Sequence, residues 1–207
     1  NDSPNTGTVS GGSLKISGIH ANSTITLLNV PVGEYTVTEA SGNGNTYVYT
    51  PSFSPESGET TVTKGETAKV TVTNTPKKQK LEYSKVWNDG DDAAGLRPTA
   101  EAFKRDLVVM LGETITEDTN VAGFTICTDA EISVVDNGSD TYAITVSGLL
   151  ERNDGKSYYI AEKAITGYKP QGVPIEKGDI TYTLFSGNLL HNNLVIPEYP
   201  ISVRKVW

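Results

Sequence analysis

A short motif, Lys-Val-Trp, occurs twice in this chain, at 85–87 and again at 205–207. The residues that lead into each copy have the pattern of a β-strand, so we interpret 81–87 and 201–207 as opening strands of β-sheet modules. The interval of 120 residues between the two copies is then the length of one module. In the first copy, Lys85 shares a strand face with Tyr83 and Trp87. A lysine in that position is either a surface residue over an aromatic pair or a buried amine that needs a partner.

Composition and charge narrow the class of protein. The 207 residues carry a net charge of −8 and the pI is about 4.8, which argues against nucleic-acid binding. One cysteine excludes an internal disulfide. Abundant Thr, Val, Tyr and Gly favour an all-β, extracellular protein, and no apolar run has the length needed to insert into a membrane.

Residues that could bind a metal do not form a recognisable site. The aspartates that follow Trp87, which are Asp89, Asp91 and Asp92, lack the spacing of a calcium loop, so we interpret them as a solvated acidic loop. His20 and His191 are isolated. We therefore expect no metal and no cofactor.

Alternating segments separated by Gly, Asn, Asp and Pro predict many short strands. We expect them at 13–16, 23–28, 34–39, 46–50, 69–73, 107–111, 122–127, 131–136, 141–147, 157–163, 180–186 and 188–196. Thr99 is a good N-cap for a short helical turn at 100–105, and 76–80 has the composition of a polar basic linker. The prediction is a β-sandwich in each of two units.

An internal repeat relates the two units. Tyr35 to Glu39 matches Tyr158 to Glu162, with aromatic, apolar and acidic residues at alternate positions. Alternation puts each glutamate on the same strand face as the core residues. Each unit then ends in a strand with an asparagine, which is Asn74 in the first unit and Asn192 or Asn193 in the second.

A lysine, a glutamic acid and an asparagine that meet in a dry core can react. Burial lowers the pKa of a lysine such as Lys85 and raises that of a glutamic acid such as Glu162. We expect the protonated carboxyl to hydrogen-bond the asparagine carbonyl, polarise it and shuttle protons while the neutral amine attacks. Ammonia leaves and an amide joins the two side chains, once only. The alternatives are a buried ion pair beside an unreactive asparagine, or residues that never meet.

The order of these motifs resembles the collagen-adhesin B-type (Cna-B) domain of Gram-positive surface adhesins and pilins. The resemblance covers 81–198 and is carried by the Lys-Val-Trp strand, the acidic loop with Gly95-Leu-Arg-Pro98, and the later Tyr158 to Glu162. It implies a reverse immunoglobulin-like (prealbumin-like) sandwich, and an autocatalytic isopeptide bond from Lys85 to Asn192 with Glu162 as the catalytic acid. The paired asparagines depart from the family pattern and keep Asn193 as an alternative, and the segment 100–105 is an insertion.

The first unit resembles the latter part of the same family but has no evident lysine strand. Glu39 and Asn74 are its candidate acid and acceptor. Three explanations are open: the chain begins inside the domain, which we favour; Lys15 serves instead; or Lys205 of another copy completes the unit in trans by strand addition. The expected organisation is a partial domain at 1–77, a complete domain at 78–198, and 199–207 as the first strand of a further repeat or a donor strand.

The resemblance implies a structural stalk or backbone module on a bacterial cell surface, anchored to the cell wall or part of a pilus. Its expected partners are neighbouring repeats, other copies of the chain through strand addition or polymerisation, and a host surface ligand. Self-crosslinking is a single turnover, so we do not expect an enzyme. The alternative is a ligand-binding adhesin module that recognises a host protein or glycan through loops such as 88–97 and 112–121.

Overall fold

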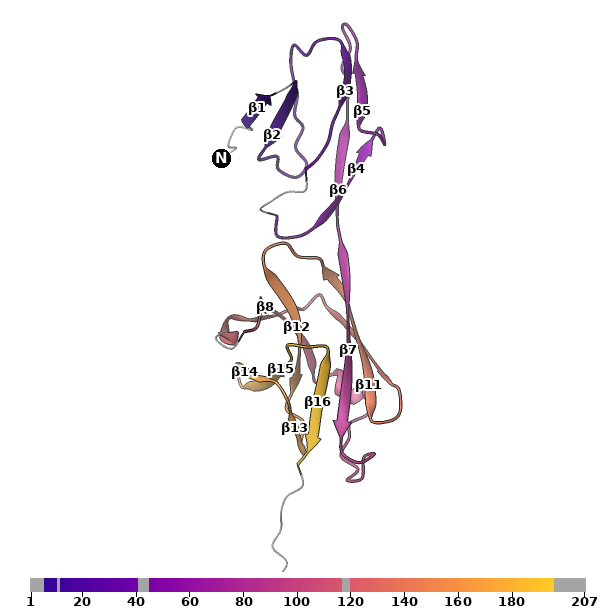
Figure 1. Ribbon diagram of the computed structural model, residues 1–207, viewed down its shortest axis with the longest axis vertical. Helices are drawn as coiled ribbons and strands as arrows, with labels where there is room; N and C mark the ends of the chain where they lie inside the picture. The colour runs from indigo at the N-terminus through magenta and orange to yellow at the C-terminus, as the bar shows by residue number, and fades with distance from the viewer. Residues whose placement is uncertain (1–5, 11, 41–44, 117–119, 196–207) are drawn as a thin grey trace, which may run out of the picture. The chain divides into compact units, whose positions relative to one another are not determined.

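A computed structural model describes residues 6–10, 12–40, 45–116 and 120–195 (Figure 1). The described residues are mostly β-strands, as the sequence predicts, with one short α-helix and one 3-10 turn. Two compact units are present, and each is described by itself. One contains the described residues within 1–38 and 53–71, and the other those within 39–52 and 72–207.

The second unit is built from two five-stranded sheets. The first sheet has the order β10 (Glu131–Asp136), β11 (Thr141–Leu150), β7 (Lys78–Asn88), β16 (Leu189–Leu194), β13 (Tyr168–Pro170). The second has the order β14 (Val173–Lys177), β15 (Ile180–Leu184), β12 (Lys156–Lys163), β8 (Leu107–Glu113), β9 (Thr125–Ile126). Side chains of β7 and β12 meet in the buried space between the sheets, so the arrangement is sandwich-like.

The strands β7 and β16 are neighbours and run parallel (Figure 1). The other neighbouring strand pairs in the described part of these two sheets are antiparallel. In the parallel pair, Leu190 lies opposite Lys85 and Asn192 lies opposite Trp87. This register places the Lys-Val-Trp motif beside the final strand of the unit.

The helix α1 (Ala100–Lys104) is the predicted helical turn. The Thr99 hydroxyl accepts a hydrogen bond from the Ala102 N–H, which caps the first turn. The helix places Phe103 in the core, where it is fully buried against Trp87. A 3-10 turn, η1 (Val121–Gly123), precedes β9. The segment 100–105 therefore supplies a core aromatic side chain.

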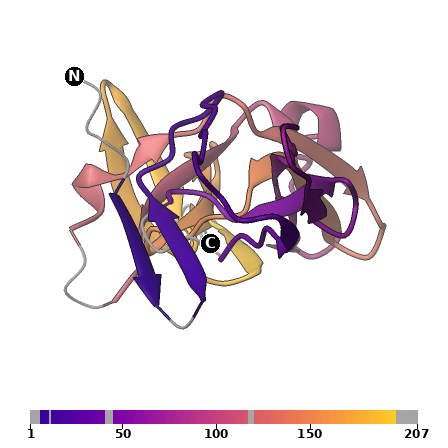
Figure 2. The same ribbon diagram turned by 90° about the horizontal axis from the view of Figure 1, so that it is seen from above.

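The other strands form three two-stranded sheets. These pair β1 (Thr6–Ser10) with β2 (Ser13–Ser17), β3 (Gly33–Thr36) with β5 (Glu59–Val62), and β4 (Tyr49–Ser54) with β6 (Thr71–Pro76). The hairpin of β1 and β2 is clear in both views (Figure 1, Figure 2). Among the described side chains before β7, no apolar side chain is buried, and Leu28 is 79% exposed.

The structure corrects several predictions in the chain order. No strand forms at 23–28, and the predicted strand 34–39 ends at Thr36, because these segments have no further strand to pair with in the described part of the chain. Four strands, β1, β5, β13 and β14, were not predicted, and the predicted strand 122–127 is reduced to β9 by the 3-10 turn η1. Residues 199–207, interpreted as a further strand, lie outside the described residues.

The predicted linker 76–80 is also wrong. β6 runs to Pro76 and β7 starts at Lys78. The Lys77 N–H donates to the Val48 carbonyl, and the Lys77 carbonyl accepts from the Glu151 N–H. Backbone pairing therefore continues through a segment whose polar composition suggested a free connection.

Candidate functional site

The structure brings Lys85, Glu162 and Asn192 together in the core of the second unit. Lys85 and Asn192 come from the neighbouring strands β7 and β16, and Glu162 comes from β12 in the facing sheet. The Glu162 carboxylate accepts a hydrogen bond from the Lys85 ammonium at Oε2 and one from the Asn192 amide at Oε1. Each of the three residues has 0% exposed surface. The carboxylate therefore bridges the two nitrogen atoms in the absence of bulk water.

Strand alternation explains how Lys85 enters the core. Along β7, Tyr83, Lys85 and Trp87 face inward while Ser84 and Asn88 are exposed. The prediction that Lys85 shares a strand face with Tyr83 and Trp87 is confirmed. Of the two interpretations of this lysine, surface residue or buried amine, the structure shows the buried amine. Glu162 provides the partner that a buried lysine requires.

Aromatic rings surround the amine. Lys85 Nζ lies 4.7 Å from the ring centroid of Trp87, 5.1 Å from that of Phe103 and 5.8 Å from that of Phe185. These rings stabilise a cation through their π-faces and exclude water from the amine. They therefore keep the amine in a desolvated environment.

Desolvation changes the acid–base properties of the buried pair. Burial lowers the pKa of Lys85 from 10.5 to about 8, although the neighbouring carboxylate opposes this shift. Burial raises the pKa of Glu162 from its ordinary value, against the effect of the ammonium. Both shifts favour transfer of a proton from Lys85 to Glu162. The product of that transfer is a neutral, nucleophilic amine beside a carboxylic acid.

One contact differs from the sequence-based prediction. We expected Glu162 to hydrogen-bond the carbonyl of the asparagine, but the carboxylate accepts from the amide nitrogen, Nδ2. The carbonyl oxygen of Asn192, Oδ1, is buried and has no hydrogen-bond partner among the residues that the structure describes. The reason is that both carboxylate oxygens already accept N–H groups, one from each neighbour.

The neighbouring asparagine is placed differently. Asn193 points to the other face of β16, as alternation requires, and its Oδ1 accepts a hydrogen bond of 2.7 Å from Asn88 Nδ2. Asn193 is half-buried. The structure therefore places Asn192, and not Asn193, beside the amine and the acid.

The candidate residues of the first repeat are solvated. Asn74 Nδ2 donates to Glu39 Oε1 at 2.8 Å, so the pair that the sequence suggested does meet, but both residues are exposed. Lys15 is exposed on β2 and belongs to the other compact unit. Lys205 lies outside the described residues. Within the described residues, no lysine forms an ion pair with the Glu39 carboxylate.

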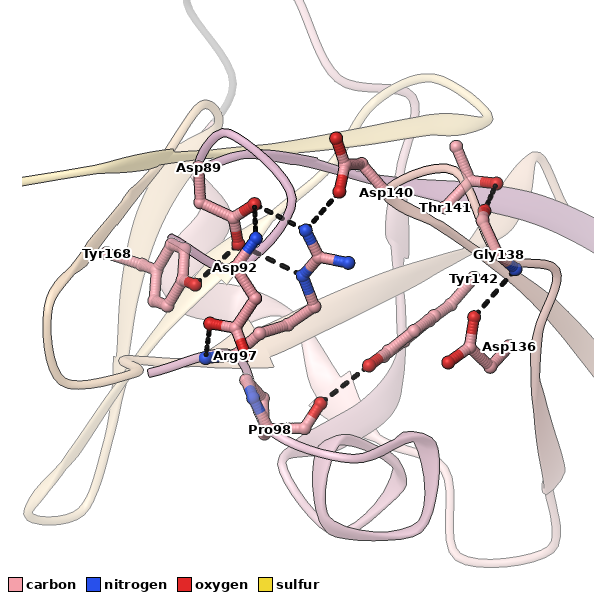
Figure 3. Close-up of polar contacts among 10 residues, drawn as sticks. All are labelled: Asp89, Asp92, Arg97, Pro98, Asp136, Gly138, Asp140, Thr141, Tyr142 and Tyr168. Atoms are coloured by element: carbon pink, nitrogen blue, oxygen red, sulfur yellow. Dashed lines mark hydrogen bonds and ion pairs between the residues drawn. The ribbon is translucent and has the colours of Figure 1, made fainter. Parts of the chain in front are cut away.

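A second polar cluster, the Arg97 cluster, was not predicted (Figure 3). The Arg97 guanidinium donates to both carboxylate oxygens of Asp89 and to Asp140, and the Tyr168 hydroxyl donates to Asp89 Oδ2 at 2.6 Å. Asp92 accepts from the Arg97 N–H at 2.9 Å. The cluster fixes the loop after β7 to the start of β11 and to β13.

The interpretation of a solvated acidic loop is therefore wrong for Asp89, which is 5% exposed. The Arg97 hydrogen bonds lower the pKa of Asp89 from 3.8 to about 2. The available signal in the sequence was Arg97 itself, a cation eight positions after the aspartate at the end of a turn-rich loop. Sequence alone does not show that the loop folds back to bring the two together.

No family model matches this sequence, and neither the curated proteins nor the solved structures include a match. Within the described residues, no group of three or more His, Cys, Asp or Glu side chains could hold a metal ion. In that same part of the chain, no helix has the length and apolar character required to cross a membrane.

Proposed function

We propose that this chain is a stalk or backbone module of a bacterial surface adhesin or pilus, stabilised by a self-formed isopeptide bond between Lys85 and Asn192. The observation that carries the proposal is the three-residue arrangement of a lysine, an acid and an asparagine, each with no exposed surface. A buried ion pair of this kind is costly to desolvate and is weak evidence of a purely stabilising role. A reactive role accounts for all three polar groups together.

The reaction follows from the contacts at Glu162. A proton moves from the Lys85 ammonium to the carboxylate, and the neutral Nζ attacks Cγ of Asn192. Glu162 also touches Nδ2, the nitrogen that must leave, so it can pass a proton from the attacking to the leaving nitrogen. One C–N bond forms, one C–N bond breaks and ammonia departs. The fold provides the high effective concentration that an unactivated amide needs.

The pH dependence of this step has two limbs. The reactive form holds one proton on the Lys85–Glu162 pair, so the rate falls when the pair loses that proton or gains a second one. The upper limb lies near pH 8, because burial lowers the pKa of Lys85 to about 8. The lower limb lies above the ordinary range of a glutamic acid, because burial raises the pKa of Glu162.

The position of the bond suits a load-bearing module. β7 and β16 are parallel neighbours near the two ends of the second unit, and the bond would join them. Pulling on the two ends would then load a covalent link between the strands rather than the hydrogen bonds of the sheet. The same link restricts the unfolded chain, as a disulfide does, without an oxidant.

The finer features of the proposal rest on the resemblance to Cna-B domains. These are the reverse immunoglobulin-like topology, the tandem arrangement, the location on a Gram-positive cell surface and the assembly with neighbouring repeats. The topology is supported by β7 and β16, which pair in parallel within one of the two five-stranded sheets. They are the first and last strands of these sheets in chain order. The alternative, ligand binding through loop 88–97, has weaker support because Asp89 and Asp92 are engaged inside the Arg97 cluster.

Single-molecule pulling on the full chain tests this function. We expect the second unit of the wild-type chain to resist extension between Lys85 and Asn192, and the Lys85→Ala variant to extend fully. Lys80→Ala is the matched control, because Lys80 lies on the same strand but is exposed. Full extension of the wild-type chain would contradict the proposal.

A further inference from the structure

Two buried polar atoms lack a hydrogen-bond partner among the described side chains: the indole nitrogen of Trp87, Nε1, and the carbonyl oxygen of Asn192, Oδ1. One is a donor and the other is an acceptor. An unpaired buried polar group destabilises the folded state, and native proteins rarely keep one without a reason. A complementary pair of such atoms beside a reactive site calls for a chemical explanation.

The two atoms belong to residues that face each other across neighbouring strands. In the parallel pair of β7 and β16, Asn192 lies opposite Trp87. Both residues point into the core, with 0% and 1% exposure respectively. Residues opposite each other on one face of a sheet are close enough for their side chains to interact.

The contacts of Glu162 leave the Asn192 carbonyl oxygen, Oδ1, without a hydrogen-bond donor during the reaction. Both carboxylate oxygens are directed at nitrogen atoms, one at Lys85 Nζ and one at Asn192 Nδ2. When the amine attacks Cγ, the electron pair of the C=O double bond moves to Oδ1, which becomes an oxyanion. A buried oxyanion requires a hydrogen-bond donor, and the acid is already occupied with proton transfer between the two nitrogens.

We propose that the indole N–H of Trp87 is this donor, and that it stabilises the oxyanion formed on Asn192 during isopeptide formation. The inference rests on the proposed function and adds a second catalytic group to Glu162. When the tetrahedral intermediate collapses, the electron pair returns to the C=O bond, the bond from Cγ to Nδ2 breaks, and ammonia leaves with the proton that Glu162 has carried from Nζ.

Attack also explains why the two atoms are unpaired before the reaction. Cγ changes from planar to tetrahedral, so Oδ1 moves out of the plane of the original amide. A donor that serves catalysis must match the position of the oxyanion rather than that of the ground-state oxygen. An unpaired donor and an unpaired acceptor in the unreacted core are the expected signs of such an arrangement.

The indole is held in place before the reaction. Its ring makes edge-to-face contacts with Phe103, Tyr142 and Tyr168, with centroid distances of 5.3, 5.6 and 5.0 Å. Tyr168 is itself fixed by its hydrogen bond to Asp89 in the Arg97 cluster (Figure 3). A donor held by packing needs no reorganisation when charge develops, which is the condition for effective electrostatic catalysis.

Replacing Trp87 in the full chain by benzothienylalanine, which keeps the bicyclic shape and has sulfur in place of N–H, tests the inference. The chain is made by cell-free translation, reactions are stopped in denaturant at timed intervals, and loss of ammonia is followed by intact mass. We expect a rate about 100-fold lower than that of wild type. The same replacement at Trp207, in the second Lys-Val-Trp motif, is the control and should leave the rate unchanged.

The pH profile separates a catalytic from a packing role. Loss of an oxyanion donor lowers the maximum rate of ammonia loss, which is the plateau of the pH–rate profile. It leaves the upper limb of that profile near pH 8, where Lys85 titrates. Loosened packing admits water and moves that limb towards 10.5, the ordinary pKa of lysine. A lowered plateau with an unmoved limb supports the inference, and a moved limb or an unchanged rate overturns it.

Failure of the inference can be told apart from failure of the proposed function. If the wild-type chain loses no ammonia, the proposed function fails and this inference fails with it. If wild type and the Trp87 variant lose ammonia at the same rate, the inference alone is overturned.

Discussion

The chain contains two Glu–Asn pairs that differ mainly in burial. Glu162 and Asn192, between the two five-stranded sheets, are hydrogen-bonded and have no exposed surface. Glu39 and Asn74 make the same kind of hydrogen bond, at 2.8 Å, on the surface. Similar residues in a similar order therefore produce a dry site in one place and a solvated contact in the other. The comparison indicates that the proposed reaction depends on the surrounding core and not on the pair alone.

The difference follows from what each pair has around it. The buried pair lies between two five-stranded sheets and beside an amine covered by Trp87 and Phe103. The exposed pair lies by the two-stranded sheet of β4 and β6, and Val72 on β6 is itself 37% exposed. Without a desolvated amine, there is no nucleophile for an unactivated amide.

The largest effect should come from removing the acceptor. Asn192→Ala would keep the Lys85–Glu162 ion pair but abolish the bond, and so leave the buried site without a crosslink, as at the exposed pair. Losing a crosslink that closes a loop of roughly 100 residues costs on the order of 4 kcal/mol, or about 10 °C in melting temperature. Calorimetry and intact mass would measure both consequences. Asn193→Ala is the matched control, and an equal loss of stability there would argue against a crosslink at Asn192.

The next prediction tests whether desolvation of Lys85 controls the rate of the proposed reaction. Phe103→Ala removes a ring from the amine and should cost about 3 kcal/mol of unfolding free energy through the cavity it leaves. It should also slow loss of ammonia, because water reaches Lys85. Phe124 is a buried phenylalanine of the separate core cluster that contains Met110 and Tyr159, so Phe124→Ala should cost a similar free energy and leave the rate unchanged. Equal rates in the two variants would show that the ring has no part in the chemistry.

A smaller effect concerns the Arg97 cluster. Arg97→Ala leaves the buried Asp89 without its cation and should cost on the order of 2 kcal/mol. The folded-state pKa of Asp89 is lowered from 3.8 to about 2, so its contribution to stability is present above pH 3.8 and is lost as the pH falls towards 2. Denaturant unfolding of the Lys85→Ala variant between pH 2 and pH 3.8 should show the unfolding free energy falling as the pH falls. Adding Asp89→Asn should remove most of this pH dependence. An unchanged pH dependence of the unfolding free energy would contradict this account.

The smallest effect should come from the exposed pair. Asn74→Ala removes a solvated hydrogen bond and should change the unfolding free energy by less than about 0.5 kcal/mol. Its mass should fall short of the value calculated from its sequence by one ammonia, as the wild-type mass does. Thermal unfolding of this variant beside Asn192→Ala compares the two pairs directly. A large loss of stability, or a deficit from the calculated mass that is smaller than that of wild type by one ammonia, would mean that the first pair also reacts.

Strand alternation was enough to predict much of the site. It put Lys85 on the face of Trp87 and Glu162 on the core face of β12, and the structure has both residues buried. It could not choose between Asn192 and Asn193, because that choice depends on which face of β16 meets β12. The direction of the Asn192 amide was predicted wrongly, since it depends on how many donors reach Glu162.

Other features depend on contacts between distant segments, which local patterns do not contain. The alternating residues at 34–39 predicted one strand, but pairing with β5 extends only from Gly33 to Thr36. The Arg97 cluster joins residues from three segments, and the opposition of Trp87 and Asn192 requires the register of two strands more than 100 positions apart. The all-β class was predictable because it depends on composition and alternation alone.

The intact mass of the purified full chain tests the central claim most directly. The account predicts a wild-type chain lighter by the mass of one ammonia, and a Glu162→Ala chain of full mass. A wild-type chain of full mass would contradict the proposed bond. A chain lighter by two ammonias would contradict the claim that only the buried pair reacts.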